Sequence, residues 1–497
     1  MRSPSTALRQ RGSALVGHSK GTFDWARAFL AIGGLIGLVS VFSLPVLGPM
    51  DEGSHLIRVA TISKGYLVAP AYGEHPVGYE VDGCLWSYLV RARALALPTP
   101  VRQAWKDHSR NGSCGDPHAL TGGGEISGAE LDSPVPYLPD IAGYIVGRAI
   151  DGAAGGVFGA RLAQFLSYLV LCWFALKIVP WGKPFVFTLA LLPVSIQGAS
   201  GVNPDAVTLS LSFAVLAGVL RCIFRSEHDK TVASNLELGG LGVAFIVLSL
   251  CKPATLPLIA LVALVPGAVF ADVWSRRKWI VGTIGGAAAT GGAWALLVGS
   301  KVRVTRPGID SAASRAWLQE HLSSVPGMLW HTATDAHAVR WFSGGIIAPL
   351  QIDQSLPLWL TVLCLLGLVF ARSVDPVPSC LIRAMGTNAV ESLTADEHAP
   401  PPGRVIRERI VAALVLIAGL IVITYGIFIS FNAPGARSIR GIQGRYLLPY
   451  APLCLFGARP TVRWNQIRVA AFVCAAALLC LNLWWLVRVM SRWHLLP

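Results

Sequence analysis

The stretch AFLAIGGLIGLVSVFSLPVLGPMDEGSH, residues 28–55, runs from a membrane-length apolar segment directly into two adjacent carboxylates. About 20 apolar residues are enough for a helix to cross a bilayer, so residues 27–47 predict a first transmembrane span. Charges near hydrocarbon are costly and persist mostly where they pair or act. Asp51 and Glu52 therefore indicate acid–base chemistry at a membrane surface. Acids favoured by the dipole at the start of an interfacial helix are the plainer alternative.

The composition of the whole chain points to the same environment. Of its 497 residues, 53% are hydrophobic and only 14% are charged, and the mean hydropathy is +0.56. A membrane β-barrel would show short alternating segments instead of long apolar runs. The predicted fold class is therefore an all-α integral membrane protein. A single polytopic membrane domain is expected over residues 27–490, after a disordered cytoplasmic tail at residues 1–26.

The apolar runs predict about eleven transmembrane helices. They fall at about 27–47, 157–179, 184–200, 204–224, 237–251, 254–272, 279–299, 357–373, 408–430, 446–459 and 467–488. Between the first two spans, residues 141–150 are too short to cross and predict an interfacial helix. A surface helix is expected at Gly83–Leu97.

The distribution of charge predicts which side each loop faces. The net charge of +14 comes largely from short links between apolar runs, which favours a cytoplasmic location for those links and for the N-terminus. The basic links contain Arg221, Arg225, Arg276, Arg277, Lys278, Arg459, Arg463 and Arg468. Outer loops are then predicted at 48–137 and 300–355, and an inner polar loop at 374–407. The expected location is the bacterial cytoplasmic membrane, and nucleic acid is not an expected partner.

The first candidate site residues follow the first span. On a helix, residues three and four apart share a face, so Asp51, His55 and Arg58 are expected to lie together, with Glu52 nearby. A carboxylate here suits a general base that takes a proton from an acceptor hydroxyl. We expect Asp51 or Glu52 to be catalytic and His55 and Arg58 to bind substrate.

Several later polar links are predicted to face the same outer side. Arginine and lysine suit phosphate, and outside the membrane they bring no topological benefit. The predicted substrate-binding residues are Asn203, Asp205, Lys252, Arg437, Arg440, Gln443, Arg445 and Tyr446. Plainer alternatives remain for each link: a turn and helix cap at Asn203-Pro204-Asp205, a snorkelling Lys252, and lipid-headgroup anchoring for the arginines.

The sequence also contains candidate metal and disulfide sites. His331, Asp335 and His337, with Arg340-Trp341, could ligate a metal, but a solvated loop helix explains them better. No cofactor is firmly indicated, although a divalent metal held by Asp51 or Glu52 is compatible with the pattern. Cys84 and Cys114 lie in the first outer loop and are candidates for a disulfide. Phosphate-loop, dinucleotide and zinc-protease signatures are absent from the sequence, so a cytoplasmic nucleotide is not the expected donor.

The order of these motifs resembles a known family. Pro-x-Asp-Glu-x-x-His-x-x-Arg at residues 49–58, Tyr137-Leu138-Pro139, Asn203-Pro204-Asp205, Lys252-Pro253 and the segment 443–449 are similar to bacterial membrane proteins of domain of unknown function family 2142. That family looks distantly like the GT-C integral membrane glycosyltransferases. The resemblance implies a polyprenyl-phosphate-sugar donor, a catalytic acid at Asp51 or Glu52, and basic residues that hold the lipid phosphate.

Three functions are compatible with these features. The leading hypothesis is an inverting glycosyltransferase that uses a polyprenyl-phosphate-linked sugar and acts on a cell-envelope glycan or a lipid-linked acceptor at the outer membrane face. The alternative is a polytopic transporter or lipid flippase, in which ionisable groups would lie near the bilayer midplane. A non-catalytic assembly protein is the third. Membrane lipids are expected partners in every case.

Overall fold

The computed structural model describes residues 23–49, 51–68, 83–95, 128–299, 309–335, 402–458 and 476–488, together with residues 341, 345 and 491. Every regular element in these ranges is a helix, which confirms the predicted all-α class. Five helices are long and apolar enough to cross a membrane: Trp25–Ser43, Val135–Ile178, Asp205–Asp229, Val273–Val298 and Pro402–Phe431. Shorter apolar helices span Asn235–Cys251, Pro253–Leu264 and Ala476–Arg488. The total of eleven spans stays a prediction.

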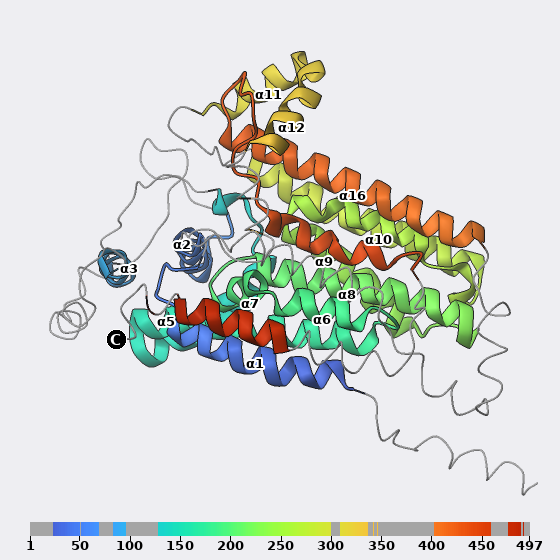
Figure 1. Ribbon diagram of the computed structural model, residues 1–497, viewed down its shortest axis with the longest axis horizontal. Helices are drawn as coiled ribbons and strands as arrows, with labels where there is room; N and C mark the ends of the chain where they lie inside the picture. Colours follow the sequence, from blue (N-terminus) through green and yellow to red (C-terminus); the bar gives the residue numbers. More distant parts are fainter. Residues whose placement is uncertain are drawn as a thin grey trace, which may run out of the picture.

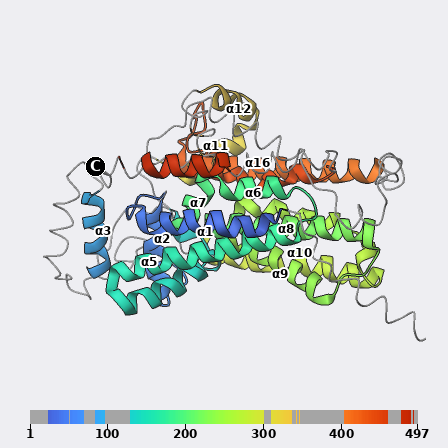
Figure 2. The same cartoon turned by 60° about the horizontal axis from the view of Figure 1, so that its bottom comes forward.

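The long helices form one bundle with roughly parallel axes (Figure 1). Its members include α1 (Trp25–Ser43), α5 (Leu138–Ile178), α8 (Asp205–Phe224), α9 (Asn235–Cys251), α10 (Val273–Gly299) and α16 (Pro402–Phe431). Helix α8 lies inside the bundle, with 78% of its apolar window buried, against 11% for α10 and 22% for α16. Figure 2 shows α16 and α9 on opposite sides of the bundle. Because so little of α10 and α16 is buried within the bundle, their outer faces are available to contact lipid.

Five predicted spans coincide with single helices, namely α1, α8, α9, α10 and α16. Local capping explains where two of them begin. The Asp24 carboxylate accepts hydrogen bonds from the backbone N–H groups of Ala26 and Arg27 at the start of α1. At the start of α9, Ser234 and Glu237 form a reciprocal capping box.

Three predicted spans are less regular than expected, because prolines interrupt them. The predicted span 184–200 is two helices, α6 (Lys183–Leu191) and α7 (Pro193–Ser200), separated at Leu192. The segments 254–272 and 446–459 contain the 3₁₀ helices η5 (Pro253–Leu264) and η8 (Gly444–Leu455), with η6 (Gly267–Val269) completing the first. Proline lacks an N–H donor and clashes with the preceding turn, so a regular α-helix cannot continue through it.

Helix α5 is a hairpin of two tightly packed arms. Its backbone leaves the helical region at Asp151 and Gly152. A Cβ atom added to Gly143 would lie 2.1 Å from the carbonyl oxygen of Gly159, and one added to Gly147 would lie 2.0 Å from that of Gly155. Only glycine permits this approach of two antiparallel backbones. The predicted interfacial helix 141–150 and span 157–179 therefore pack directly against each other.

Smaller helices gather at one end of the bundle. They are α2 (Glu52–Ser63), α3 (Gly83–Leu95), η2 (Ala129–Leu131), η3 (Val135–Tyr137), α11 (Ser311–Glu320), η7 (Leu322–Ser324) and α12 (Val325–Thr334). Helix α3 corresponds to the predicted surface helix. Figure 1 places α2 and α3 at the same end as the C-terminal end of α1, and α11 and α12 beside the C-terminal end of α16. We call this the polar end of the bundle.

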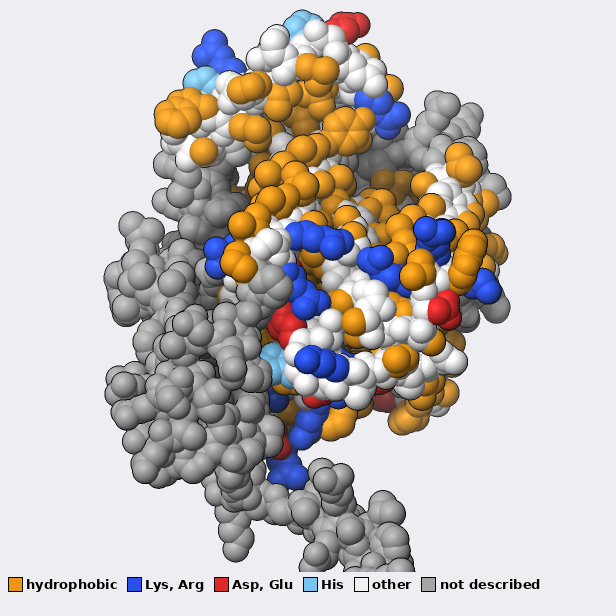
Figure 3. Space-filling view, turned by 90° about the vertical axis from the view of Figure 1, so that its right-hand side faces the viewer, with side chains coloured by type: hydrophobic (Ala, Val, Ile, Leu, Met, Phe, Trp, Pro, Cys, Tyr) orange, Lys and Arg blue, Asp and Glu red, His pale blue; other side chains and the backbone are white. Residues whose placement is uncertain are grey.

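The opposite end of the bundle is rich in basic side chains. Figure 3, which views that end, shows lysine and arginine spread over the described surface. Exposed examples are Arg27, Lys230, Arg277, Lys278 and Arg407. Ion pairs join the helix ends there, with Arg404 Nη1 3.4 Å from Glu227 Oε1 and Arg225 Nη1 2.7 Å from Glu237 Oε2. We call it the basic end of the bundle.

Some predictions lie outside the described residues. These include residues 1–22, the span 357–373, nearly all of the inner loop 374–407, and about half of the second outer loop 300–355. Cys84 is disulfide-bonded. Its predicted partner Cys114 is not among the described residues, so that pairing stays a prediction.

Candidate functional site

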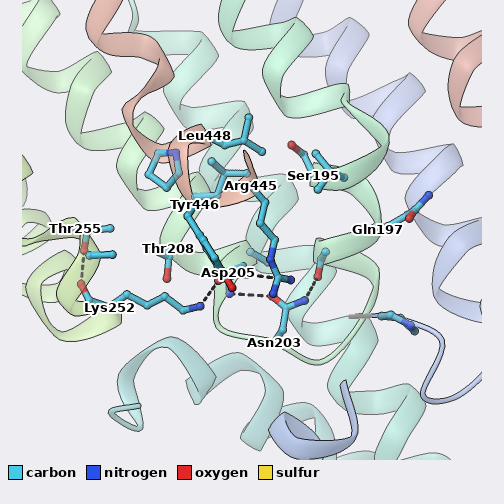
Figure 4. Close-up of a pocket in the computed structure, with 17 residues that line it drawn as sticks. Ser195, Gln197, Asn203, Asp205, Thr208, Lys252, Thr255, Arg445, Tyr446 and Leu448 are labelled. Atoms are coloured by element: carbon cyan, nitrogen blue, oxygen red, sulfur yellow. Dashed lines mark hydrogen bonds and ion pairs between the residues drawn. The ribbon is translucent and has the colours of Figure 1, made fainter. Parts of the chain in front are cut away.

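A pocket opens at the polar end of the bundle. It contains about 750 Å³ of empty space, part of it open to solvent. Segments far apart in the sequence meet around it: the link before α2, helix α7, the start of α8, the start of η5 and the start of η8. Its lining residues are Pro49, Val194, Ser195, Gln197, Gly198, Asn203, Asp205, Ala206, Thr208, Leu209, Lys252, Ala254, Thr255, Arg445, Tyr446, Leu448 and Pro449. Figure 4 shows the polar members converging from these elements.

Four charged side chains form a continuous row, which we call the charge chain; Asp205, Lys252 and Arg445 line the pocket, and Asp51 lies beside it through its contact with Arg445. Arg445 Nη2 donates to Asp51 Oδ2 at 2.9 Å, and Arg445 Nη1 lies 3.3 Å from Asp205 Oδ2. The Lys252 ammonium pairs with the other oxygen of Asp205. The order is thus Asp51, Arg445, Asp205, Lys252, alternating in sign. Links that are up to 394 residues apart in sequence meet here, as the predicted common side requires.

Exposure differs along the charge chain. The Asp51 side chain is 45% exposed, whereas Arg445 is 11% exposed. Asp205 and Lys252 are intermediate, at 26% and 22%. Asp51 is therefore the member of the chain most accessible to a ligand. The two cations are half-buried, where attraction to an anion is screened less by water.

The backbone at Asp51 is unusual. Its φ is +58° and its ψ is +10°, in the left-handed region that few residues other than glycine adopt. Asp51 precedes the first residue of α2, yet its carboxylate does not cap that helix. The carboxylate instead pairs with Arg445. Such conformations cost about 1–3 kcal/mol and cluster at functional sites.

The Asn203-Pro204-Asp205 link forms the tight turn and helix start that its sequence predicts. Asn203 Oδ1 accepts a hydrogen bond from the Asp205 backbone N–H at 2.8 Å, and Asn203 Nδ2 donates to the Gly198 carbonyl at 2.8 Å. Gln164 on α5 donates to the Asn203 carbonyl. The capping role and the position on the pocket therefore coexist, because the turn aims Asp205 at the two cations.

The second acid of the pair lies in a different environment. Glu52 is 1% exposed. Its carboxylate accepts Arg161 Nε and Nη2, both at 2.6 Å, and the backbone N–H groups of Leu47 and Val202 at 2.8 and 3.2 Å. A carboxylate with four donors and no exposure has no access to a substrate. Of the two predicted bases we therefore retain Asp51, and we assign Glu52 a structural role.

His55 and Arg58 follow Asp51 on α2 but point to different partners. His55 Nδ1 lies 2.6 Å from Tyr137 Oη. Arg58 is 1% exposed and donates to the backbone carbonyls of Leu67 and Asp132 at 2.6 and 3.1 Å. Arg58 therefore joins the segment after α2 to the segment before η3, and it is not among the residues that line the pocket. Its predicted substrate contact is not supported by this geometry.

The remaining predicted residues divide between the pocket and the surface. Tyr446 lines the pocket, and Arg445 lies over its ring at 5.3 Å from the centroid. Arg437 and Arg440 are exposed and do not line the pocket. Gln443 is 8% exposed and also lies outside the lining. The arginine-rich link thus contributes one arginine, Arg445, to the site.

The polar residues of the second outer loop lie elsewhere. Asp335 Oδ2 accepts a hydrogen bond from Ser438 Oγ at 3.4 Å, and Thr332 Oγ1 accepts one from the Ile439 backbone N–H at 2.8 Å. His337 and Arg340 lie outside the described residues. Within the described ranges, three or more His, Cys, Asp or Glu side chains are nowhere grouped to hold a metal ion. The α11–α12 region therefore braces the link that leads to Arg445.

Comparison with known proteins identifies the family. A family described as predicted membrane protein (DUF2142) matches residues 35–454. The chain belongs to this family. No curated protein and no solved structure matches the chain. The DUF2142 match contains the whole charge chain, from Asp51 to Arg445, so these residues lie inside the family's shared region.

Some important residues of this DUF2142 member are not predicted from its sequence. Arg161 lies inside the predicted span 157–179, and an ionisable residue inside an apolar span is a signal that the sequence carries. Ser195, Gln197, Thr208 and Thr255 line the pocket, but small polar residues in apolar runs are common and carry little signal. The side-chain Oε1 of Gln197 is buried without a hydrogen-bond partner among the described residues.

The arrangement suits a phosphorylated ligand. Arg445 and Lys252 both contact Asp205. An anionic group of a ligand that enters between these two cations would take the place of the Asp205 carboxylate as their partner. The pocket beyond them is lined by apolar side chains, including Val194, Leu209 and Leu448. Among the described residues, the two acids of the charge chain are Asp51 and Asp205, and the Arg445 guanidinium lies between them.

Proposed function

We propose that the protein transfers a sugar from a polyprenyl-phosphate donor to a hydroxyl of a cell-envelope glycan or a lipid-linked acceptor. The observation that carries this proposal is the charge chain at the mouth of an apolar-lined pocket. Two cations there suit the donor phosphate, an open carboxylate suits the acceptor, and the apolar lining suits the lipid next to the phosphate. A likeness to GT-C glycosyltransferases is part of the same proposal.

The polar end would face outward, at the outer face of the cytoplasmic membrane. The exposed lysines and arginines of the basic end support this orientation, because short cytoplasmic links carry an excess of positive charge. Cysteine substitutions at exposed positions provide the test. A membrane-impermeant thiol reagent applied to intact cells should label Arg440→Cys and spare Lys230→Cys. The reverse pattern would overturn the orientation and place the site in the cytoplasm.

The chemistry is an in-line displacement at the anomeric carbon. The acceptor oxygen attacks as Asp51 takes its proton, and the lipid phosphate leaves with the bonding electron pair on the opposite side. Arg445 and Lys252 stabilise the charge that develops on the departing phosphate, the kind of electrostatic stabilisation that contributes most in a partly dehydrated site. One displacement inverts the anomeric configuration. The product should therefore have the opposite anomeric configuration to the donor.

The test measures transfer by purified protein in proteoliposomes that contain polyprenyl-phosphate sugars and a glycan acceptor. Asp51→Asn should lower the transfer rate by about 10²–10⁴-fold, the usual contribution of a positioned base. Asp310→Asn is the matched control, because Asp310 caps α11 near the same end and asparagine caps equally well. Full activity of Asp51→Asn would overturn the base assignment.

A second pair of variants tests the phosphate contact. Arg445→Gln should raise the donor KM strongly, while Arg315→Gln, an exposed arginine on α11, should leave it unchanged. Donor lipid that crosses the bilayer without any sugar transfer would instead favour the transporter or flippase alternative. The anomeric configuration of the product, read by NMR coupling constants, then checks inversion.

A further inference from the structure

Behind the charge chain lies a second row of polar side chains. His55 Nδ1 is 2.6 Å from Tyr137 Oη, and Tyr137 Oη donates to Asp132 Oδ2 at 3.0 Å. Tyrosine has one O–H proton, and here it is given to Asp132. Tyr137 must then accept from His55, which places the imidazole proton on Nδ1. The other ring nitrogen, Nε2, is left as a base.

His55 connects this row to the proposed reaction. Its backbone N–H donates to the Asp51 carbonyl at 3.3 Å, one turn earlier in α2. The four members of the charge chain all act electrostatically on the His55 ring. Within the described part of the chain, Tyr137 is the only hydrogen-bond partner of that ring. Nε2 is therefore the ring atom that remains to exchange a proton, and Asp51 is the acid one helical turn away.

The row is held firmly by its surroundings. Arg58 Nη2 bridges the carbonyls of Asp132 and Leu67, at 3.1 and 2.6 Å. Ser133 Oγ donates to the Leu250 carbonyl at 2.5 Å, which ties the segment to the end of α9. A row fixed in this way needs little rearrangement when a proton moves. Through this contact Arg58 positions the backbone of Asp132.

We propose that His55, Tyr137 and Asp132 form a proton relay that carries the acceptor's proton away from Asp51. This inference rests on the proposed sugar transfer. As the new bond from acceptor oxygen to sugar carbon forms, the bond to phosphate breaks and its electron pair stays with phosphate. Asp51 receives the hydroxyl proton and passes it to His55 Nε2. The Nδ1 proton moves to Tyr137 Oη, and the Tyr137 proton moves to Asp132. One proton thus leaves the pocket and one carboxylate is neutralised.

The protonation states suit this direction of transfer. Burial lowers the pKa of His55 to about 4, with Lys252 and Arg445 acting in the same sense and Asp51 and Asp205 opposing, so the ring is neutral at pH 7. Burial raises the pKa of Asp132 to about 6. Lys252, Tyr137 and Arg58 oppose that rise, while the negative charge of Asp205 supports it. Glu130 is a further negative neighbour of Asp132.

The pH dependence follows from Asp132. Its carboxylate can accept a proton only when ionised, which requires a pH above about 6. The transfer rate should therefore rise with pH through a limb centred near 6. A variant that breaks the link between Asp132 and the site should lose the rise in transfer rate near pH 6 and keep the wild-type donor binding.

Tyr137→Phe is the decisive variant, because it removes one oxygen and keeps the ring. We expect the transfer rate to fall about 10²-fold, the lower range for general acid–base steps, with an unchanged donor KM and no limb near pH 6. Tyr144→Phe is the matched control. Tyr144 is equally buried and accepts a hydrogen bond from Arg148, but lies outside the relay. If both variants behave alike, with the wild-type rate and pH profile, the relay is overturned.

A measurement that does not depend on sugar transfer separates the relay from the proposed function. Infrared difference spectra of the full-length protein between pH 5 and 7 should contain a carboxyl band that Asp132→Asn removes and Tyr137→Phe shifts. His55→Ala should regain transfer when imidazole is added, which a purely structural histidine would not allow. If the carboxyl band responds to both substitutions as expected but the protein transfers no sugar, the proposed function is rejected and the proton path is supported. A band unaffected by Tyr137→Phe would overturn the relay.

Discussion

Asp51 and Glu52 are neighbours in sequence and opposites in environment. Glu52 is sealed against Arg161, with both side chains 0% exposed. Asp51 is 45% exposed and pairs with Arg445 at a pocket mouth. Two adjacent carboxylates therefore each pair with an arginine, Glu52 in a fully buried site and Asp51 in a partly exposed one. The comparison teaches that a buried, fully hydrogen-bonded pair holds the helices together, whereas an open, shared pair can exchange a partner for a ligand.

The largest effect is expected from breaking the sealed pair. Glu52→Gln leaves Arg161 buried without a counter-charge, which typically costs about 3–5 kcal/mol. The thermal unfolding midpoint in detergent should fall markedly. Asp51→Asn is the matched control and should keep the wild-type midpoint, since an exposed ion pair is worth at most about 1 kcal/mol. Equal midpoints for the two variants would contradict the division of roles.

A smaller effect is expected from the hairpin that carries Arg161 to Glu52. Gly147→Ala places a methyl group against the Gly155 carbonyl, so the two arms of α5 must separate. Overpacking of this kind costs about 1–3 kcal/mol and should lower the unfolding midpoint. A Cβ atom at Gly285 on α10 meets nothing within 4 Å, so Gly285→Ala serves as control. If Gly147→Ala and Gly285→Ala give the same unfolding midpoint, the two arms of α5 do not pack as closely as described above.

The open side of the comparison is tested at Lys252. Lys252→Gln removes one of two cations, while Asp205 keeps its contact with Arg445. Affinity for a polyprenyl phosphate should fall by about tenfold, equivalent to about 1.4 kcal/mol. Equilibrium binding to protein in nanodiscs provides the measurement. Lys64→Gln, at an exposed lysine after α2, should bind normally, and a similar loss in both variants would point to a general charge effect.

The smallest effect is expected at Arg440. It lies in the same link as Arg445 but is exposed and outside the pocket lining. Arg440→Gln should change donor affinity by less than about 0.5 kcal/mol, the usual range for surface substitutions. The same binding assay decides the matter. A loss as large as that of Arg445→Gln would extend the site outward along the link.

Much of the fold is predictable because membrane spans depend mainly on length and hydropathy. The predicted ranges for α1, α8, α9, α10 and α16 agree with the structure, since an apolar run of about 20 residues has few alternatives in hydrocarbon. The breaks at Leu192 and in η5 and η8 were less predictable. Proline marks where a helix is disturbed, but the conformation that replaces the helix depends on the neighbours that accept the freed hydrogen bonds.

The candidate site is predictable as a set of residues but not as a geometry. Charges at the ends of apolar runs stand out, so Asp51, Asp205, Lys252 and Arg445 are all recognisable. The separation of Arg445 from Arg437 and Arg440 is not visible in sequence, because all three share one polar link. Asp132 is not recognisable in the sequence, since one acid among several in a long polar loop is unremarkable until Tyr137 and His55 lie beside it.

The sequence by itself determined that this is a helical membrane protein whose unusual charges gather at one end, because hydrocarbon tolerates few charges and few backbone arrangements. Only the tertiary structure decided which acid of the Asp51-Glu52 pair is sealed and which is open. The reason is physical: the side chains of adjacent residues leave the backbone in different directions, and the packing of α5 against α2 places Arg161 on one side and leaves the other to Arg445.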